Sequence, residues 1–134
     1  NYVFTGCTLG AYVIFYFHLQ MIDAAGNSMW TYNVNDNNTV AYSVAETNDN
    51  SLIVTGSYQQ SYSAQSALYK FDKNGNKIWG KLYQEFATYL SNKTVIQTHD
   101  GGYIINSQKA KANNNSGETD QIYIFKTNDK GEFN

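Results

Sequence analysis

A polar turn followed by a tryptophan occurs twice in this sequence, and the repetition constrains the fold more than any other feature. The first copy is Asp23-Ala-Ala-Gly-Asn-Ser-Met-Trp30, and the second, Asp72-Lys-Asn-Gly-Asn-Lys-Ile-Trp79, lies 49 positions later. Gly and Asn tolerate the positive φ angles of tight turns, while Asp and Asn side chains hydrogen-bond to nearby backbone groups. Because strand-like residues flank both copies, each copy predicts a β-hairpin. A third, cut-off copy lies at residues 125–133.

The segments between these turns repeat as well. Tyr2-Val-Phe-Thr-Gly6 matches Leu52-Ile-Val-Thr-Gly56, 50 positions later, and Tyr103-Ile-Ile-Asn-Ser107, a further 51 positions along. Each unit of about 50 residues therefore carries four strand-like runs separated by turns. In the only complete unit, the predicted strands are 39–47, 51–58, 67–71 and 77–83. The strands predicted on either side are 2–9, 12–22, 28–34, 93–98, 103–109 and 121–126.

Four antiparallel strands in a unit of this length are typical of a β-propeller blade. We therefore predict an all-β chain, a single repeat segment over residues 1–134, with about two and a half blades. Its parts are a partial blade at 1–35, a blade at 39–84 and a partial blade at 93–134. One blade cannot bury both of its faces, so its large residues must pack against a neighbour. Since propellers typically have about 4 to 8 blades, we expect the chain to belong to a larger propeller, to assemble with copies of itself, or to stack openly with partners at its ends.

Charge and hydropathy argue against two classes of partner. The net charge of −2, with nine scattered lysines as the only basic residues apart from two histidines, lacks the clustered positive charge of a nucleic-acid footprint. The longest apolar run, residues 11–17, is far shorter than the roughly 20 residues of a membrane-spanning helix. No signal peptide is visible and the first residue is not Met, which predicts a processed chain or a segment of a larger one. The single cysteine, Cys7, is predicted to be a small core residue.

The last unit also carries a resemblance to a known repeat. Three segments contain it: Asp100-Gly-Gly-Tyr-Ile-Ile105, Gln121-Ile-Tyr-Ile-Phe-Lys126 and Asn128-Asp-Lys-Gly131. They resemble the repeat that fills large secreted and surface propeller proteins of bacteria and archaea. The stretch from Asp72 to Trp79 is similar to the tryptophan-docking motif of quinoprotein-like propellers, in which Asp and Gly shape a hairpin and the indole stacks between blades. The resemblance covers nearly the whole chain and implies inter-blade packing for Trp30 and Trp79, but it specifies architecture rather than activity.

One turn alternates oxygen-bearing side chains in the manner of a calcium loop. Asp72, Asn74 and Asn76 occupy alternate positions, but an EF-hand loop needs Gly at its sixth position and Glu at its twelfth. Here Gly75 falls at the fourth position and the later acid is missing. The pattern favours a structural turn, with a calcium site as the alternative and no other cofactor predicted.

The sequence nominates no catalytic residue. It contains no Gly-x-Ser-x-Gly, Gly-x-Gly-x-x-Gly or phosphate-loop motif. His18 and His99 are far apart and have no clustered Cys or acid beside them, which argues against a zinc site. Other carboxylates, including Glu46, Asp49 and Asp100, lie in or beside turns, where solvated structural roles explain them.

A tyrosine-rich segment offers a candidate contact surface. Tyr58-Gln-Gln-Ser-Tyr62 is predicted to lie in a loop between strands, where Tyr58 and Tyr62 could contact a protein or glycan partner. Three Asn-x-Ser/Thr sequences, at 37–39, 92–94 and 114–116, match the glycosylation acceptor pattern and favour an extracellular chain. An insertion at 110–119 is predicted to be a surface loop.

These patterns predict a non-catalytic structural or adhesive binding module that is extracellular or at the cell surface. Its expected partner is protein, either copies of itself or the rest of a larger chain, or else a glycan, with no nucleic acid and no membrane span. Two alternatives remain: a fragment of a quinoprotein-like or glycosidase propeller enzyme, and a glycan-binding lectin.

Overall fold

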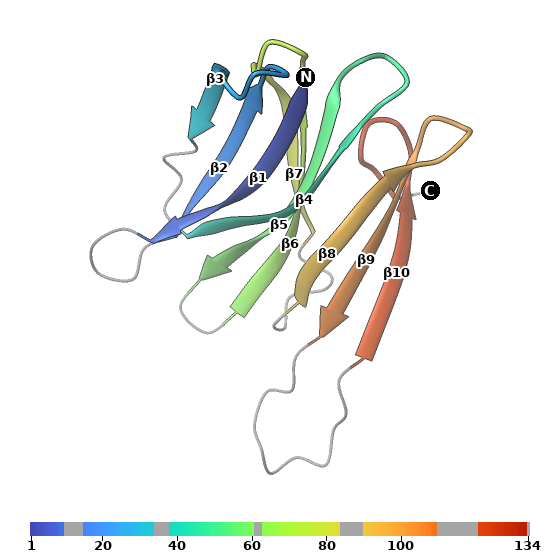
Figure 1. The fold of residues 1–134 in the computed structure, drawn as a ribbon. Helices are drawn as coiled ribbons and strands as arrows, with labels where there is room; N and C mark the ends of the chain where they lie inside the picture. The colour runs from blue at the N-terminus through green and yellow to red at the C-terminus, as the bar shows by residue number, and fades with distance from the viewer. Residues whose placement is uncertain (10–14, 34–37, 61–62, 84–89, 110–120, 134) are drawn as a thin grey trace.

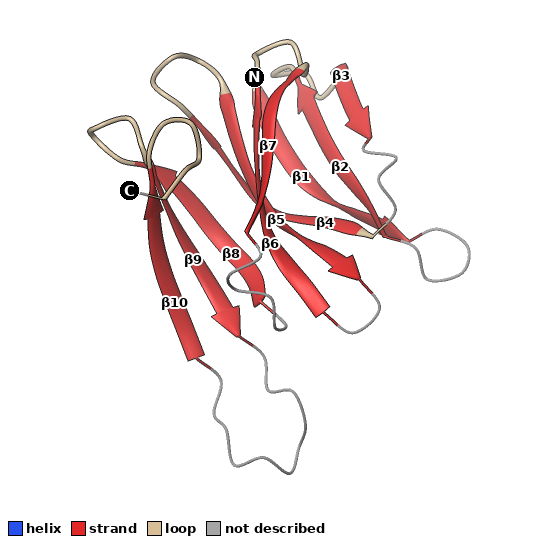
Figure 2. Cartoon of the chain, turned by 180° about the vertical axis from the view of Figure 1, so that it is seen from behind, coloured by secondary structure: helices blue, strands red, loops and turns tan. Residues whose placement is uncertain are grey.

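Antiparallel strands make up the fold, which a computed structural model describes at residues 1–9, 15–33, 38–60, 63–83, 90–109 and 121–133. These residues form ten strands in three sheets and contain no helix (Figures 1 and 2). The first sheet has the order β1 (Tyr2–Leu9), β2 (Phe15–Ile22), β3 (Ser28–Asn33). The second has the order β4 (Thr39–Glu46), β5 (Leu52–Gln60), β6 (Ser63–Phe71), β7 (Lys77–Tyr83). The third consists of β8 (Leu90–Gln97), β9 (Tyr103–Lys109) and β10 (Gln121–Thr127), with β9 in the centre.

The prediction of an all-β chain with antiparallel sheets is confirmed. β1, β7 and β9 have the predicted bounds, whereas β5 and β6 are longer than predicted and pair as far as Gln60 and Ser63. The predicted loop at 58–62 is therefore wrong for residues 58–60, because their backbone continues the ladder to β6. Residues 12–14 of one predicted strand, and the predicted insertion at 110–119, lie outside the described residues.

The three sheets share one pairing register. Thr55 of β5 pairs with Leu68 of β6, and Asn106 of β9, 51 positions after Thr55, pairs with Ile124 of β10. The first sheet follows the same plan, since Trp30 pairs with Met21 as Trp79 pairs with Lys70. β4 and β8 each contain a register shift at matching places, between Ala41 and Ser43 and between Asn92 and Thr94. The pairs show which residues occupy equivalent positions in different sheets.

Successive residues of a strand point to opposite faces of its sheet, and the second sheet uses both faces for packing. The core between the first and second sheets contains Phe17, Leu19, Ala41, Leu52, Val54, Ala67, Tyr69 and Phe71. The core between the second and third sheets contains Ile53, Leu68, Tyr83, Val95, Tyr103 and Ile105. Each fully buried Leu, Ile or Phe contributes roughly 1.5–3 kcal/mol relative to an exposed one. The apolar run in β5 is explained by this position between two neighbours.

All the described hairpin turns gather at one end of the sheets (Figure 1). They connect β2 to β3, β4 to β5, β6 to β7 and β8 to β9, and one more turn follows β10. After that turn, Phe133 pairs with Thr127, where a fourth strand of the third sheet would begin. We call this end the turn end.

Candidate functional site

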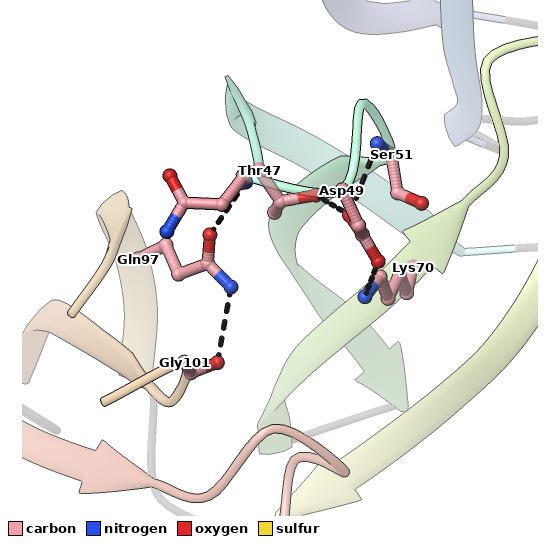
Figure 3. A network of polar contacts seen from close by, with 7 residues as sticks. Thr47, Asp49, Ser51, Lys70, Gln97 and Gly101 are labelled. Carbon is pink, nitrogen blue, oxygen red and sulfur yellow. Dashed lines mark hydrogen bonds and ion pairs between the residues drawn. The ribbon is translucent and has the colours of Figure 1, made fainter. Parts of the chain in front are cut away.

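The turn between β4 and β5 is built around one carboxylate at the turn end. Asp49 accepts hydrogen bonds at Oδ1 from the Thr47 hydroxyl and from the Ser51 N–H, the latter at 3.1 Å. Its Oδ2 accepts a charged hydrogen bond of 2.8 Å from Lys70 Nζ on the neighbouring strand β6 (Figure 3). The Lys70 side chain is only 12% exposed, so the ion pair is partly shielded from water on that side.

The electrostatics of this pair favour both charged forms. The hydrogen bond from Lys70, followed by the one from Thr47, holds the pKa of Asp49 far below its ordinary value of 3.8. Partial burial of the Lys70 ammonium opposes its charge, but the interactions with Asp49 and Tyr103 together outweigh burial, so the pKa of Lys70 is raised. The pair therefore stays ionised at neutral pH.

The same arrangement recurs in the third sheet. Asp100, 51 positions after Asp49, accepts hydrogen bonds from the Thr98 hydroxyl and the Gly102 N–H, and it pairs with Lys126 of β10. The hydrogen bonds from Lys126 and then Thr98 lower the pKa of Asp100. Each aspartate thus links a turn to the third strand of its own sheet through an ion pair, and both carboxylates are engaged in hydrogen bonds.

A side-chain bridge connects the turns of the second and third sheets. Gln97, the last residue of β8, accepts a hydrogen bond of 2.8 Å at Oε1 from the Asn48 N–H, and its amide nitrogen donates to the Gly101 carbonyl at 3.1 Å (Figure 3). Sequence reasoning missed Gln97, because a contact between sheets leaves no local pattern. The Thr-x-Asp spacing at 47–49 and 98–100 was the signal that would have identified the two ion-paired turns.

The turn proposed as a calcium alternative uses its carboxylate internally. Asp72 accepts three hydrogen bonds of 2.8 Å, from the N–H groups of Asn74 and Asn76 and from the Asn76 side-chain amide. The turn at Asp23 is built in the same way. Within the described residues, no group of three or more His, Cys, Asp or Glu side chains could hold a metal ion. The calcium site stays a prediction.

Each tryptophan lies over the turn of the following sheet. The Trp30 ring covers Gly75, and its Nε1–H donates a hydrogen bond of 3.0 Å to the Lys73 carbonyl. A Cβ added to Gly75, whose φ is +85°, would lie 2.7 Å from that ring. The Trp79 ring covers Gly131 in the same way, at 3.0 Å from the corresponding point. Both tryptophans therefore contact a neighbouring sheet, at a glycine whose missing side chain makes room for the indole.

The candidate contact residues do not form a described surface. Tyr58 is half-buried in β5 between Thr39 of β4 and Gln65 of β6, and Tyr62 lies outside the described residues. The prediction that Cys7 is a core residue is wrong, because its side chain is exposed. His18 is hydrogen-bonded on the first sheet, whereas His99 is exposed in a turn.

A cavity of about 480 Å³ lies between the first and second sheets at the turn end. Its lining combines apolar and polar side chains, among them Tyr2, Met29, Trp30, Glu46, Asn50 and Asn74. Glu46 occupies the position that Gln97 has in the third sheet, at the end of the first strand. The cavity lies beside this glutamate at the first junction, and sequence reasoning also missed it.

Comparisons with known proteins add no family assignment. No family model matches the chain, and no curated protein matches it in sequence. In the described part of the chain, no helix is long and apolar enough to cross a membrane.

Proposed function

We propose that the chain forms part of a β-propeller-type stack and serves as a non-catalytic structural or adhesive binding module, outside the cell or at its surface. The observation that carries the proposal is the repeated contact of a tryptophan with the glycine turn of the next sheet, Trp30 on Gly75 and Trp79 on Gly131. Because the same contact occurs at both junctions, it indicates a common way in which neighbouring sheets pack. It matches the docking role that the sequence resemblance implies.

The way in which neighbouring sheets meet also supports a propeller-type arrangement. β4, the first strand of the second sheet, lies against β1 and β2, and β8 in turn lies against β5 and β6. The first strand of each of these two sheets thus packs against the preceding sheet, and this repeated contact supports an arrangement of successive blades around an axis. We propose about two and a half such blades in this chain, with protein partners supplied by a larger chain or by further copies.

A binding role suits the chemistry of the turn end better than catalysis does. Asp49 and Asp100 are held in ion pairs, and Asp72 is used by its own turn. Rigid sheets that display a row of polar turns are suited to recognising a surface. The fragment of a propeller enzyme is the less favoured alternative, since it requires convergent acids or a cofactor pocket.

Assembly and catalysis are tested on the intact chain. Size-exclusion chromatography with light scattering reports whether copies associate; a stable, well-folded monomer of about 15 kDa would contradict assembly with copies and leave a larger chain as the source of partners. Turnover in a panel of glycoside and quinone-dependent oxidation assays would contradict the non-catalytic role.

The cavity favours glycan binding as a second candidate function. Trp30 and Tyr2 offer aromatic surface, while Glu46, Asn50 and Asn74 offer hydrogen-bonding groups around the same space. Aromatic faces with a few polar groups are typical of ligand pockets. A glycan array tests it: saturable binding that Tyr2→Ala abolishes and Tyr42→Ala leaves intact would support a lectin. Tyr42 is a suitable control because it is 39% exposed and does not line the cavity.

A further inference from the structure

The cavity at the first junction has an equivalent place in the second junction, and a tyrosine side chain lies there. Leu52 lines the cavity from the second sheet. Its equivalent in the third sheet is Tyr103, 51 positions later. Each of the two residues is paired with the last residue of the preceding strand, Leu52 with Glu46 and Tyr103 with Gln97. The first junction therefore has a shorter side chain, without a ring, where the second has a tyrosine.

The walls of the cavity are equivalent to the residues around the Tyr103 ring. That ring lies beside Trp79, with centroids 6.1 Å apart. Burial raises the pKa of the Tyr103 hydroxyl, and the charge of the nearby Lys70 ammonium opposes that rise. Trp30 and Met21 are the equivalents of Trp79 and Lys70, and both line the cavity. Tyr103 is fully buried, so the second junction fills with its own ring a space that is open at the first.

The first junction has a larger aromatic residue elsewhere, but that residue fills a different part of it. Phe71 occupies the position that Thr127 has in the third sheet. Its ring packs against Phe17 and Tyr32, with centroids 5.9 Å and 4.8 Å away. None of these three rings lines the cavity. Phe71 therefore does not replace the ring that is missing beside Trp30.

Polar groups surround the same space. Glu46, Asn50, Lys73 and Asn74 line the cavity together with the apolar residues, and Glu46 is exposed at the end of β4. Carboxylate and amide oxygens accept a hydrogen bond from a hydroxyl group. The volume of about 480 Å³ lies within the range of roughly 300–1,000 Å³ that is typical of ligand pockets. The cavity thus offers space for a ring and acceptors for one hydroxyl.

We propose that this cavity binds a small phenol, whose ring lies beside Trp30 and Met21 as the Tyr103 ring lies beside Trp79 and Lys70. Glu46 or a neighbouring amide accepts the hydrogen bond of the phenol hydroxyl. Such a site goes beyond the proposed structural role, because its occupancy does not depend on whether copies of the chain assemble. Its ligand is a flat aromatic ring, whereas the glycan candidate is a saturated one.

p-Cresol, which is the tyrosine side chain as a free molecule, is the probe for this site. Two-dimensional NMR follows the indole N–H signals of Trp30 and Trp79, the two tryptophans of the chain. Trp30 is the reporter, since its N–H donates to the carbonyl of Lys73, a residue that lines the cavity. We expect p-cresol to shift the Trp30 signal saturably and to leave that of Trp79 in place. 4-Methylcyclohexanol, its saturated counterpart, should bind about 2- to 10-fold more weakly, because pairs of aromatic rings attract beyond the area they bury.

Filling the cavity should close the site. Leu52→Phe places a ring where the second junction has that of Tyr103, so the affinity for p-cresol should fall about tenfold or more. The Tm should stay the same or rise, because filling a cavity commonly stabilises a fold. Leu82→Phe is the matched control: it is the same change at a side chain that is 44% exposed and does not line the cavity. This variant should bind p-cresol as the natural chain does.

Several results would overturn the phenol site. Equal shifts of the two indole signals would mean that p-cresol does not select this cavity, and an unchanged affinity in Leu52→Phe would place its binding elsewhere. Equally tight binding of 4-methylcyclohexanol would show that the cavity does not select an aromatic ring. Binding of methyl glucoside where p-cresol does not bind would favour the glycan candidate. If Leu52→Phe failed to fold, the two indole signals and the two probes would still decide the question on the natural chain.

Discussion

The two junctions between sheets use the same tryptophan contact but differ in the side-chain interactions around it. The first junction is aromatic: the rings of Phe17 and Phe71 stack with centroids 5.9 Å apart, and Tyr32 meets Phe71 edge-on at 4.8 Å. The second adds polar links, the Gln97 bridge and a hydrogen bond of 2.8 Å from the Tyr83 hydroxyl to the Gly131 carbonyl. The contact between a tryptophan and a glycine turn is thus common to both junctions, whereas the surrounding side-chain contacts differ between them.

The largest expected loss is in the aromatic core of the first junction. Phe71→Ala removes a ring that is fully buried and contacts both Phe17 and Tyr32, so the free energy of unfolding should fall by about 3–5 kcal/mol. Chemical denaturation followed by circular dichroism measures it. Ile122→Ala, at a side chain that is 76% exposed, should change stability by less than about 0.5 kcal/mol. A loss below 1 kcal/mol for Phe71→Ala would mean that the aromatic core is not what joins these sheets.

The contact between tryptophan and glycine, which both junctions share, can be tested by substituting the glycine. Gly75→Ala introduces backbone strain of roughly 1–2 kcal/mol at positive φ, and its Cβ would also displace the Trp30 ring, which adds about 1–3 kcal/mol. Gly101→Ala is the matched control: its φ is also +85°, but the nearest atom to its added Cβ is 3.9 Å away. Only Gly75→Ala should shift the tryptophan fluorescence. Equal losses at the two sites would contradict a packing role for Gly75.

The glutamine bridge should contribute less than the tryptophan contacts. Gln97→Ala removes two hydrogen bonds at a partly exposed site, with an expected loss of about 1 kcal/mol. Glu46→Ala, at the equivalent position of the first junction, should cost less than about 0.5 kcal/mol because the residue is exposed. Hydrogen exchange at the Asn48 amide gives a local readout, and it should speed up only in the Gln97 variant. Unchanged exchange would show that the bridge does not persist in solution.

The smallest expected effect is in the acid dependence of stability. Because the folded pKa of Asp49 lies below the ordinary value of 3.8, its ion pair stabilises the fold fully above that pH and loses its contribution as pH falls further. Asp49→Asn should therefore flatten the decline in Tm between about pH 4 and pH 2, by a modest amount since the carboxylate is 56% exposed. Asp129→Asn, in an exposed turn, is the control. An unchanged decline would assign the acid sensitivity to other groups.

The repeated turn-and-tryptophan segments predicted the strands and their hairpins well, because local chemistry determines both. Residues 58–60 were misassigned, since Tyr and Gln in an apparently polar segment give no sign that β6 pairs with them. The Gln97 bridge and the cavity beside Glu46 were not predictable, because each depends on how separate sheets meet in space. The repeat spacing identified which residues occupy equivalent positions. It could not show where equivalent residues make different contacts, because those contacts depend on the three-dimensional arrangement of the sheets.

The tryptophan contacts give the chain a direction. Each indole lies on the turn of the unit that comes later in the sequence, Trp30 on Gly75 and Trp79 on Gly131. Duplication of one whole unit within the gene would keep an indole and a glycine at every boundary, whereas a breakpoint between a tryptophan and the next turn would leave one without its counterpart. Insertion of whole units would therefore change the length of such a protein while each new boundary between units keeps the tryptophan and glycine that contact each other.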